Sequence, residues 1–276
     1  MTAITVPLTT RRPRQFRQLR YALVLAKRNI IKITRAPEQL IDVTLQPVIF
    51  LLLFYYVFGG ALSSMLATHP GMSVTRHDYL QFLVPGMLAQ TLAMSSIAIG
   101  QNMNADIEKG VFDRFRSLPI GRAIPLVGAV FAEFFRYLMV FVISIGFGYV
   151  LGFRVQTNPL ALLAALGLSV GFALSFAWLS VWIGMMVRSS SSVQGIMMLL
   201  VLPLSFGSNT FVQATTMPGW LQAFVKVNPI SNLVTAVRGL LLGGPVATDL
   251  GWTLVWIAGL LAVFFPLALR AYIRRT

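Results

Sequence analysis

The stretch QNMNADIEKGVFDRFRSLP, residues 101–119, lies between two long apolar runs and decides how the chain is organised. It holds three of the eight acidic residues of the whole chain. Read as a helix, it places Phe112 and Phe115 on one face, because residues three apart are neighbours on a helix surface. Pro119 ends such a helix. A helix over 106–119 is shorter than the roughly 20 residues that cross a bilayer, so the pattern predicts an amphipathic helix at a membrane surface.

Two interpretations of this charged segment stay open. It can be a solvated loop that does no more than mark the cytoplasmic side of the membrane. It can also be a docking helix for a soluble partner. The docking helix is favoured by the predicted cytoplasmic placement of this segment and by the lack of an energy source within the chain.

The composition is typical of a membrane protein. Hydrophobic residues make up 57% and charged residues 11% of the 276 residues, whereas about 25% charged residues is usual in a soluble domain. We therefore expect an all-α integral membrane protein with one transmembrane domain over residues 1–276. The absence of cysteine excludes disulfides and thiol chemistry. Six transmembrane helices are predicted, over residues 43–62, 82–101, 125–152, 159–187, 193–213 and 252–270.

Two further segments are amphipathic or apolar without being spans. Residues 13–36 form a basic pattern of helical period, which predicts a helix lying in the membrane interface. This helix can be a topology anchor that binds anionic lipid or a contact for a partner. Residues 218–242 contain two apolar helices of about ten residues each, which are too short to cross. Pro229 separates them, since it holds Asn228 extended. We expect these two helices to be a re-entrant pair.

Basic residues are distributed unevenly between the two sides of the predicted membrane. The net charge is +14. Seventeen basic residues lie on the side of the N-terminal segment and of residues 101–119, and four lie on the other side. They flank apolar runs, so the charge indicates membrane topology rather than nucleic-acid binding. Both termini and residues 101–119 are predicted to face the cytoplasm, and residues 218–242 to face outward.

The predicted spans contain two features of interest. Gly167 and Gly171, four residues apart, predict close packing against another helix of the same chain. Glu133 and Arg136, three residues apart, form an ionisable pair at shallow membrane depth, which is a candidate functional site by default. An internal ion pair that fixes the helix position is the plainer interpretation of Glu133 and Arg136.

The sequence contains no motif for an energy source of its own. No Gly-x-x-x-x-Gly-Lys-Ser/Thr loop, His-Glu-x-x-His or Gly-x-Ser-x-Gly motif occurs, and no metal-binding cluster. Apart from Glu133, the spans hold almost no carboxylates, and ion-coupled transporters use ionisable sites near the midplane. The chain is therefore interpreted as a pathway that an external motor drives. The alternative is an ion-gradient-driven secondary transporter that uses Glu133.

Three stretches together resemble a known family. One is Pro85-Gly86 followed by ADIEKGVFDRFRSLPIGR, residues 105–122. Another is the Arg-Ser-Ser-Ser-Ser turn at 188–192, which leads into a span containing Leu-Pro-Leu-Ser. The last is residues 211–243, with Asn228-Pro229-Ile230 and Arg-Gly-Leu. In this order and spacing they resemble the ABC-2 type permeases of ATP-binding-cassette exporters, in the daunorubicin and antibiotic-resistance branch.

The resemblance implies an assembly in the bacterial plasma membrane. Two permease copies, identical or different, would combine with separate ATPase subunits that carry ATP and Mg²⁺, while this chain holds no cofactor and is not an enzyme. The family's coupling helix would fall on residues 106–119 and its external re-entrant helices on residues 218–242. The implied ATPase-coupling residues are Glu108, Gly110, Phe112, Asp113, Arg114, Phe115 and Pro119, and the implied outer-gate residues are Asn228, Pro229 and Arg238.

The substrate is less sharply indicated by the sequence. Methionine-rich apolar surfaces adapt to varied apolar ligands, which favours an amphipathic drug, antibiotic, lipid or glycolipid over a sugar or an ion. Each residue assigned to the substrate path can equally be an ordinary packing or lipid-facing residue. The predicted path residues are Gln46, Gln90, Met94, Met198 and Asn209.

Overall fold

The computed structural model describes residues 45–57, 76–110 and 124–275. Within these ranges the regular structure is helical and includes no strand, which confirms the all-α prediction there. The helices are Leu45–Val57, α3 (Arg76–Ser95), α4 (Ile97–Glu108), α6 (Ile124–Leu151), α7 (Pro159–Met186), α8 (Ser190–Phe206), the short 3-10 turn η1 (Ala214–Thr216), α9 (Gly219–Val227), α10 (Pro229–Leu242) and α11 (Ala247–Arg275).

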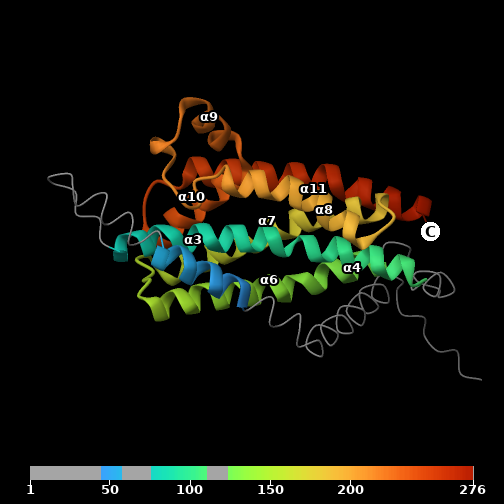
Figure 1. Ribbon diagram of the computed structural model, residues 1–276, viewed down its shortest axis with the longest axis horizontal. Coiled ribbons are helices and arrows are strands. Elements are labelled where there is room, and N and C mark those ends of the chain that lie inside the picture. The colour runs from blue at the N-terminus through green and yellow to red at the C-terminus, as the bar shows by residue number, and fades with distance from the viewer. Residues whose placement is uncertain (1–44, 58–75, 111–123, 276) are drawn as a thin grey trace, which may run out of the picture.

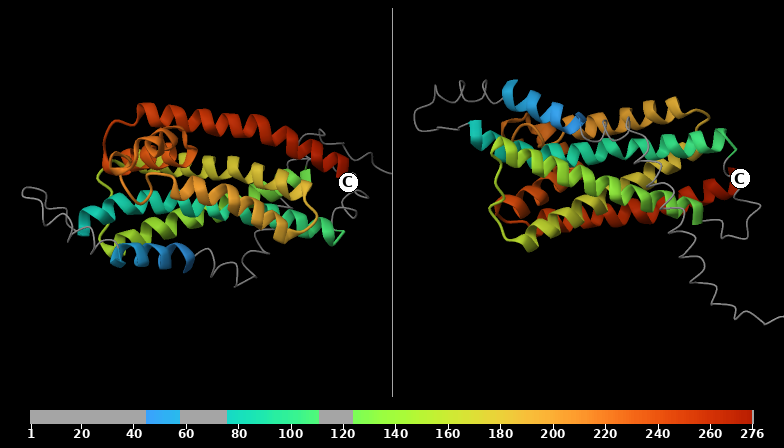
Figure 2. Two further views of the ribbon diagram at one scale, coloured as in Figure 1. Left: turned by 45° about the horizontal axis from the view of Figure 1, so that its top comes forward. Right: turned by 90° about the horizontal axis from the view of Figure 1, so that it is seen from below.

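The long helices run side by side in an elongated bundle (Figures 1 and 2). α3 and α4 follow one another in line, and together they make the apolar segment His77–Glu108 of 32 residues. α7 and α11 pack along each other, with the rings of Trp178 and Phe265 edge to face at 4.7 Å. We call the end that holds α9, α10 and the start of α3 the α9 end. The opposite end, with the end of α4, the α7–α8 connection and the C-terminal end of α11, is the α4 end.

The joint between α3 and α4 is the single residue Ser96. Its hydroxyl donates to the carbonyl of Leu92 one turn earlier, at 3.0 Å, and also to the carbonyl of Ala173 on α7, at 3.4 Å. A serine hydroxyl that bonds to the preceding turn competes with the helical hydrogen bonds and bends the helix. Ser96 therefore interrupts the long segment at its middle and attaches it to α7.

Two helices begin with the same Asn-Pro pair. The side chain of Asn158 accepts from the backbone N–H of Ala161 at 2.8 Å and so caps α7. Asn228 caps α10 in the same way. In both cases the proline occupies the first helical position, where its missing N–H costs nothing and its fixed φ suits the helix.

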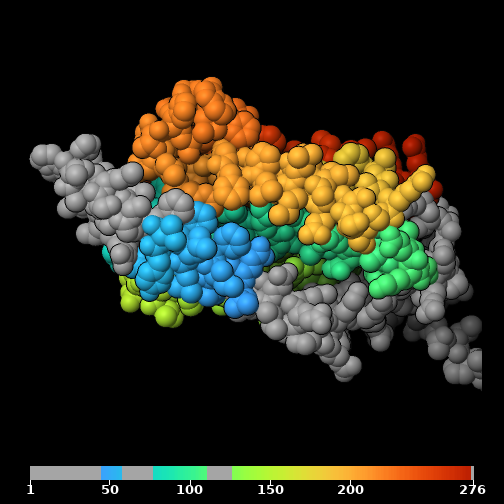
Figure 3. All heavy atoms as spheres, in the orientation of Figure 1, coloured from blue at the N-terminus to red at the C-terminus, as the bar shows by residue number. Residues whose placement is uncertain are grey.

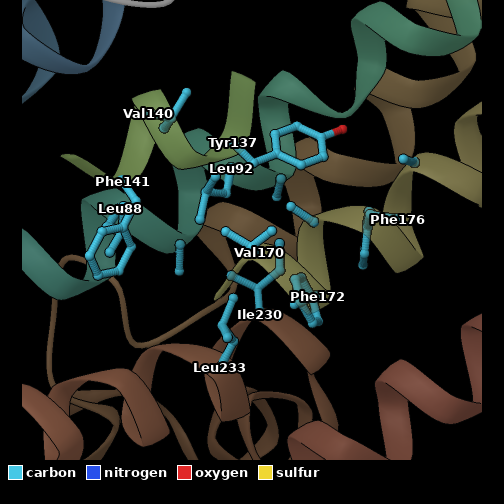
Figure 4. Close-up of a cluster of buried hydrophobic side chains, with 14 of the residues drawn as sticks. Leu88, Leu92, Tyr137, Val140, Phe141, Val170, Phe172, Phe176, Ile230 and Leu233 are labelled. Atoms are coloured by element: carbon cyan, nitrogen blue, oxygen red, sulfur yellow. The ribbon is translucent and has the colours of Figure 1, made fainter. Parts of the chain in front are cut away.

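The core lies where α3, α6, α7 and α10 meet (Figure 4). Phe172 and Phe176 of α7 lie one turn apart, with ring centroids at 4.9 Å, and both are buried. Leu88 and Leu92 of α3 and Ile230 of α10 are also buried in this cluster. Residues 169–181 of α7 are largely buried, so α7 is the central helix of the bundle.

The surface of the bundle is as apolar as a lipid environment requires. α8 exposes large apolar side chains, with Leu199 at 75%, and helix Leu45–Val57 does the same on the same face of the molecule (Figure 3). Four segments are long and apolar enough to cross a bilayer: His77–Glu108, Leu126–Leu151, Pro159–Met186 and Ala247–Arg274. The described parts of the other predicted spans, Leu45–Val57 and Ser190–Phe206, are shorter. The six-span layout stays a prediction.

Helix bounds differ from the predicted spans in an instructive way. α6 and α7 each begin and end within one residue of 125–152 and 159–187. α8 contains Pro203 and ends at Phe206 rather than at 213, and the N–H of Gly207 makes the last helical hydrogen bond, to the carbonyl of Pro203 at 2.8 Å. The α3–α4 segment extends past both ends of 82–101, and α11 begins before 252. The predicted segment 13–36 lies outside the described residues.

Core packing predicts that Phe172→Ala strongly lowers the stability of the fold. Removing a buried phenyl ring leaves a cavity and costs about 3 kcal/mol of unfolding free energy, which appears as a fall of several degrees in Tm. Thermal unfolding of the detergent-solubilised chain measures this. Phe135→Ala is the matched control, because Phe135 is 41% exposed on α6, and it should shift Tm much less. Equal shifts for the two variants would contradict the core assignment.

Candidate functional site

The side chain of Asn228 makes three hydrogen bonds in the interior. Its Oδ1 accepts from the backbone N–H of Ile230 at 2.9 Å and caps α10. Its Nδ2 donates to the carbonyls of Leu204, at 2.7 Å, and Gly207, at 3.1 Å. The last carbonyls of a helix have no backbone donor of their own, and these two lie at the end of α8. A single amide therefore starts α10 and holds it to the end of α8.

Arg238 connects α10 to α3. Its Nη2 donates to the carbonyls of Phe82, at 3.0 Å, and Asn209, at 3.2 Å. The guanidinium carbon also lies 3.6 Å from the centroid of the Phe82 ring. No carboxylate pairs with Arg238 among the described residues. Two carbonyl dipoles and the negative face of an aromatic ring stabilise its charge instead.

The turn after α8 completes the contact between α3 and α10. Nδ2 of Asn209 donates to the hydroxyl of Thr235 at 2.7 Å, and that hydroxyl donates to the carbonyl of Ser231 at 3.0 Å. A Cβ atom added to Gly86 would lie 2.6 Å from the carbonyl oxygen of Thr210. Only glycine allows the backbones of α3 and this turn to approach so closely.

We call Phe82, Asn209, Asn228, Thr235 and Arg238 the α9-end junction. Nε of Arg238 and Oδ1 of Asn209 are buried there without a hydrogen-bond partner in the described part of the chain. Unpartnered buried polar groups cost free energy. The junction holds amides, a hydroxyl and a guanidinium but no carboxylate or imidazole. It connects helices and offers no group for acid–base catalysis.

The predicted outer-gate residues Asn228, Pro229 and Arg238 thus lie in one connected structure. Phe82 and Thr235 belong to it and were missed in the sequence. Thr235 lies four residues after Ser231 and three before Arg238, which places all three on one face of α10. That spacing of polar residues in an apolar helix is the signal that could have found Thr235.

Glu133 and Arg136 form the predicted ion pair on α6. Nη1 of Arg136 lies 3.5 Å from Oε2 of Glu133, and both side chains are buried. Nε of Arg136 has no hydrogen-bond partner among the described residues. The pair is long and incompletely hydrogen bonded.

The predicted path residues are not gathered in one pocket. Gln46 and Met198 are exposed, on helix Leu45–Val57 and on α8, whereas Gln90 is buried on α3. Met94 and Asn209 are half-buried. A small apolar pocket does lie between helix Leu45–Val57, α3 and α6, but none of the five lines it. Its lining residues are Pro47, Val48, Leu51, Val84, Met87, Thr91, Ser144 and Phe147.

The predicted coupling segment begins differently from the prediction. α4 continues to Glu108 and ends in the turn at Lys109 and Gly110, where Gly110 has a φ of 64°. The expected start of a separate helix at residue 106 is therefore wrong, because 106–108 are the last turn of α4. Glu108 is exposed at this end. The other predicted coupling residues, Phe112, Asp113, Arg114, Phe115 and Pro119, lie outside the described residues.

Comparisons with known proteins agree on one family. Residues 21–242 match the model of the ABC-2 type transporter family. The chain is 39% identical to the daunorubicin resistance ABC transporter permease protein DrrB1 of Streptomyces coeruleorubidus, over 86% of this chain and 80% of that protein. It is 26% identical to the probable doxorubicin resistance ABC transporter permease protein DrrC of Mycobacterium tuberculosis, over 81% and 78% of the two chains.

A conservative change at Asn228 tests the junction. Asn228→Asp keeps the Oδ1 cap of α10 but replaces the Nδ2 donor with an oxygen facing two carbonyls. Breaking hydrogen bonds of a buried group in this way costs about 3 kcal/mol or more, so Tm should fall by several degrees. Asn158→Asp is the matched control, because Asn158 also caps a helix but is exposed. A fall in Tm as large for Asn158→Asp would show that loss of the Asn228 donor is not the cause.

Proposed function

The chain belongs to the ABC-2 type transporter family, and on that premise we propose that it is the permease of an ATP-driven exporter of amphipathic drugs. Permeases of this family are not enzymes. ATP and Mg²⁺ would bind to a separate ATPase subunit, and two permease copies would form the translocation unit. The observation that carries the proposal is the identity to a daunorubicin resistance permease, which is sustained over most of both chains.

Charge supports an orientation with the α4 end in the cytoplasm. Lys109, Arg188 and Arg270 lie toward the α4 end, and Arg274 lies in the last turn of α11. Toward the other end lie Arg76, Arg154, Lys226 and Arg238. The orientation therefore rests on the whole chain, with its predicted excess of seventeen basic residues over four. Positive residues collect on the cytoplasmic side of bacterial membrane proteins. In this orientation Glu108 faces the ATPase subunit, and the α9-end junction faces the exterior.

The two ends of the bundle have different roles in the proposed permease. At the α4 end, α4 leads through Gly110 into the segment that we propose as the ATPase contact. At the α9 end, α9 and α10 do not cross the bundle, and hydrogen bonds of Asn228 and Arg238 hold α10 in place. We assign the outer gate to that end.

An amphipathic drug suits the exposed surfaces of the bundle. α8 and helix Leu45–Val57 expose large apolar side chains on the same face, including Leu199 and Phe50. A path between two permease copies along such faces would offer apolar contact and little charge. The names of the similar proteins refer to daunorubicin and doxorubicin, so a drug of this class is the substrate to test first, ahead of lipid or glycolipid.

Co-purification tests the ATPase partner. The tagged chain, isolated in mild detergent, should carry an ATPase at about one-to-one stoichiometry, as two permeases and two ATPases require. Glu108→Lys should remove that ATPase, because it reverses an exposed charge at the proposed contact. Lys226→Glu reverses an exposed charge at the opposite end and should retain it. A chain that emerges without ATPase, in a detergent shown to preserve oligomers, would contradict the proposal.

The energy source is tested with Glu133→Gln. In proteoliposomes containing the purified complex, daunorubicin export should require ATP and proceed without a proton gradient. Glu133→Gln should leave ATP-driven export by the folded complex in place. Removing one partner of a buried ion pair costs about 3 kcal/mol of stability, so the yield of folded complex is measured beside export. Export that runs on a proton gradient without ATP, and that Glu133→Gln abolishes, would support the secondary-transporter alternative instead.

A further inference from the structure

α4 and α7 touch backbone to backbone near the α4 end. A Cβ atom added to Gly184 would lie 2.5 Å from the carbonyl oxygen of Gly100, and one added to Gly100 would collide with the carbonyl of Ser180. The hydroxyl of Ser180 also donates to the carbonyl of Ile97 at 3.1 Å. Helices that approach this closely cannot rotate against one another without a clash.

Asn104 lies one turn beyond this crossing and is fully buried. Its Nδ2 donates to the carbonyls of Gly184, at 2.9 Å, and Val187, at 2.8 Å. α7 ends at Met186, and the backbone of Val187 is extended. Both carbonyls lie at the end of α7, where the regular helical hydrogen bonds stop. The side chain of α4 thus completes the end of α7.

The start of α8 joins the same group of contacts. The hydroxyl of Ser190 donates to the carbonyl of Gln101 at 3.3 Å and to Oδ1 of Asn104 at 3.4 Å. The side chains of Gln101 and Gln194 also lie 3.4 Å apart. α4 therefore contacts both the last turn of α7 and the first turn of α8. Its contact with α6 is slight by comparison.

α8 connects this group to the far end of the bundle. At the α4 end it begins at Ser190, and at the α9 end its last carbonyls, of Leu204 and Gly207, accept from Asn228. A helix of 17 residues is about 25 Å long. Two buried asparagines thus contact α8 at its two ends. Asn228 donates to carbonyls at the end of α8, and Asn104, which donates to carbonyls at the end of α7, accepts from the hydroxyl of Ser190 at the start of α8.

We propose that α4, α7 and α8 move as one rigid unit, and that Asn104 transmits movement of the ATPase contact through α8 to Asn228 and α10. The inference rests on the proposed function, since it presumes an ATPase that acts at the end of α4. Asn104 lies four residues before Glu108, one helical turn. A shift of Glu108 at the end of α4 is carried by the contacts of Asn104 to the end of α7 and, through the hydroxyl of Ser190, to the start of α8. Asn104 is a positioning residue and contacts no substrate.

A cross-link tests the rigid unit directly. The chain has no cysteine, so Gln101→Cys with Gln194→Cys introduces a single pair of thiols, on α4 and α8. Joining the two with a short bifunctional thiol reagent should leave ATP-driven daunorubicin export unchanged, because the two helices do not move relative to each other. The same sample without reagent is its own control. Export that stops on cross-linking, and continues in the untreated sample, would overturn the proposal.

Transmission is tested with Asn104→Asp, which keeps the size of the side chain and removes the donor. The drug exported for each ATP hydrolysed should fall roughly tenfold, a typical coupling between distant sites, while the ATPase still co-purifies. Asn102→Asp, the same change on the half-buried face of α4, should leave the ratio unchanged. A ratio unaltered by Asn104→Asp in a folded complex would overturn the role of Asn104. A wild-type complex without ATP-dependent export would instead refute the proposed function itself.

Discussion

The constraint on which this structure depends is that a helix end inside an apolar bundle must find hydrogen-bond donors in the protein. In an apolar interior an unpartnered carbonyl is costly. This chain meets the requirement with side chains from neighbouring helices. Asn104 completes the end of α7, Asn228 completes the end of α8, and Arg238 binds carbonyls of α3 and of the turn after α8. Each satisfied helix end is therefore also a contact between helices.

This arrangement explains how a chain with so few charged residues obtains a specific packing. In lipid, apolar side chains gain little by leaving the membrane for the protein interior, so packing and hydrogen bonds must select the helix partners. Glycines supply the close approaches, at Gly86 against Thr210 and at Gly100 against Gly184. The amides then fix which carbonyls face which donors. Polar contacts collect at both ends of α8, and the middle of the bundle is packed with aliphatic and aromatic side chains.

The sequence predicted the long helices well, because long apolar runs with polar ends define α6 and α7 almost to the residue. The break at Asn228-Pro229 was also readable from its dipeptide. The close helix crossings could not be predicted from the sequence. The Gly167 and Gly171 pair was expected to pack closely, but Gly167 has no atom near its Cβ position, and Gly171 has only Ile257 at ordinary contact distance. The true crossing uses single glycines on two separate helices, which no spacing within one segment reveals. Asn104 was hidden because it stands in a polar stretch that resembles a surface loop. The segment with the remaining coupling residues lies outside the described structure.

The contact between Gly100 and Gly184 also limits how this protein can change by mutation. At most close contacts in a protein core the two residues can change in sequence, because a larger residue on one side is compensated by a smaller one on the other. No residue is smaller than glycine, so a contact of two glycine backbones has no such compensating pair, and enlargement of either residue stands alone. Neither Gly100 nor Gly184 can therefore be replaced by a larger residue. Diversification of what the bundle accepts is left to its exposed apolar faces, such as those of α8 and helix Leu45–Val57, where one side chain can replace another without disturbing a neighbour.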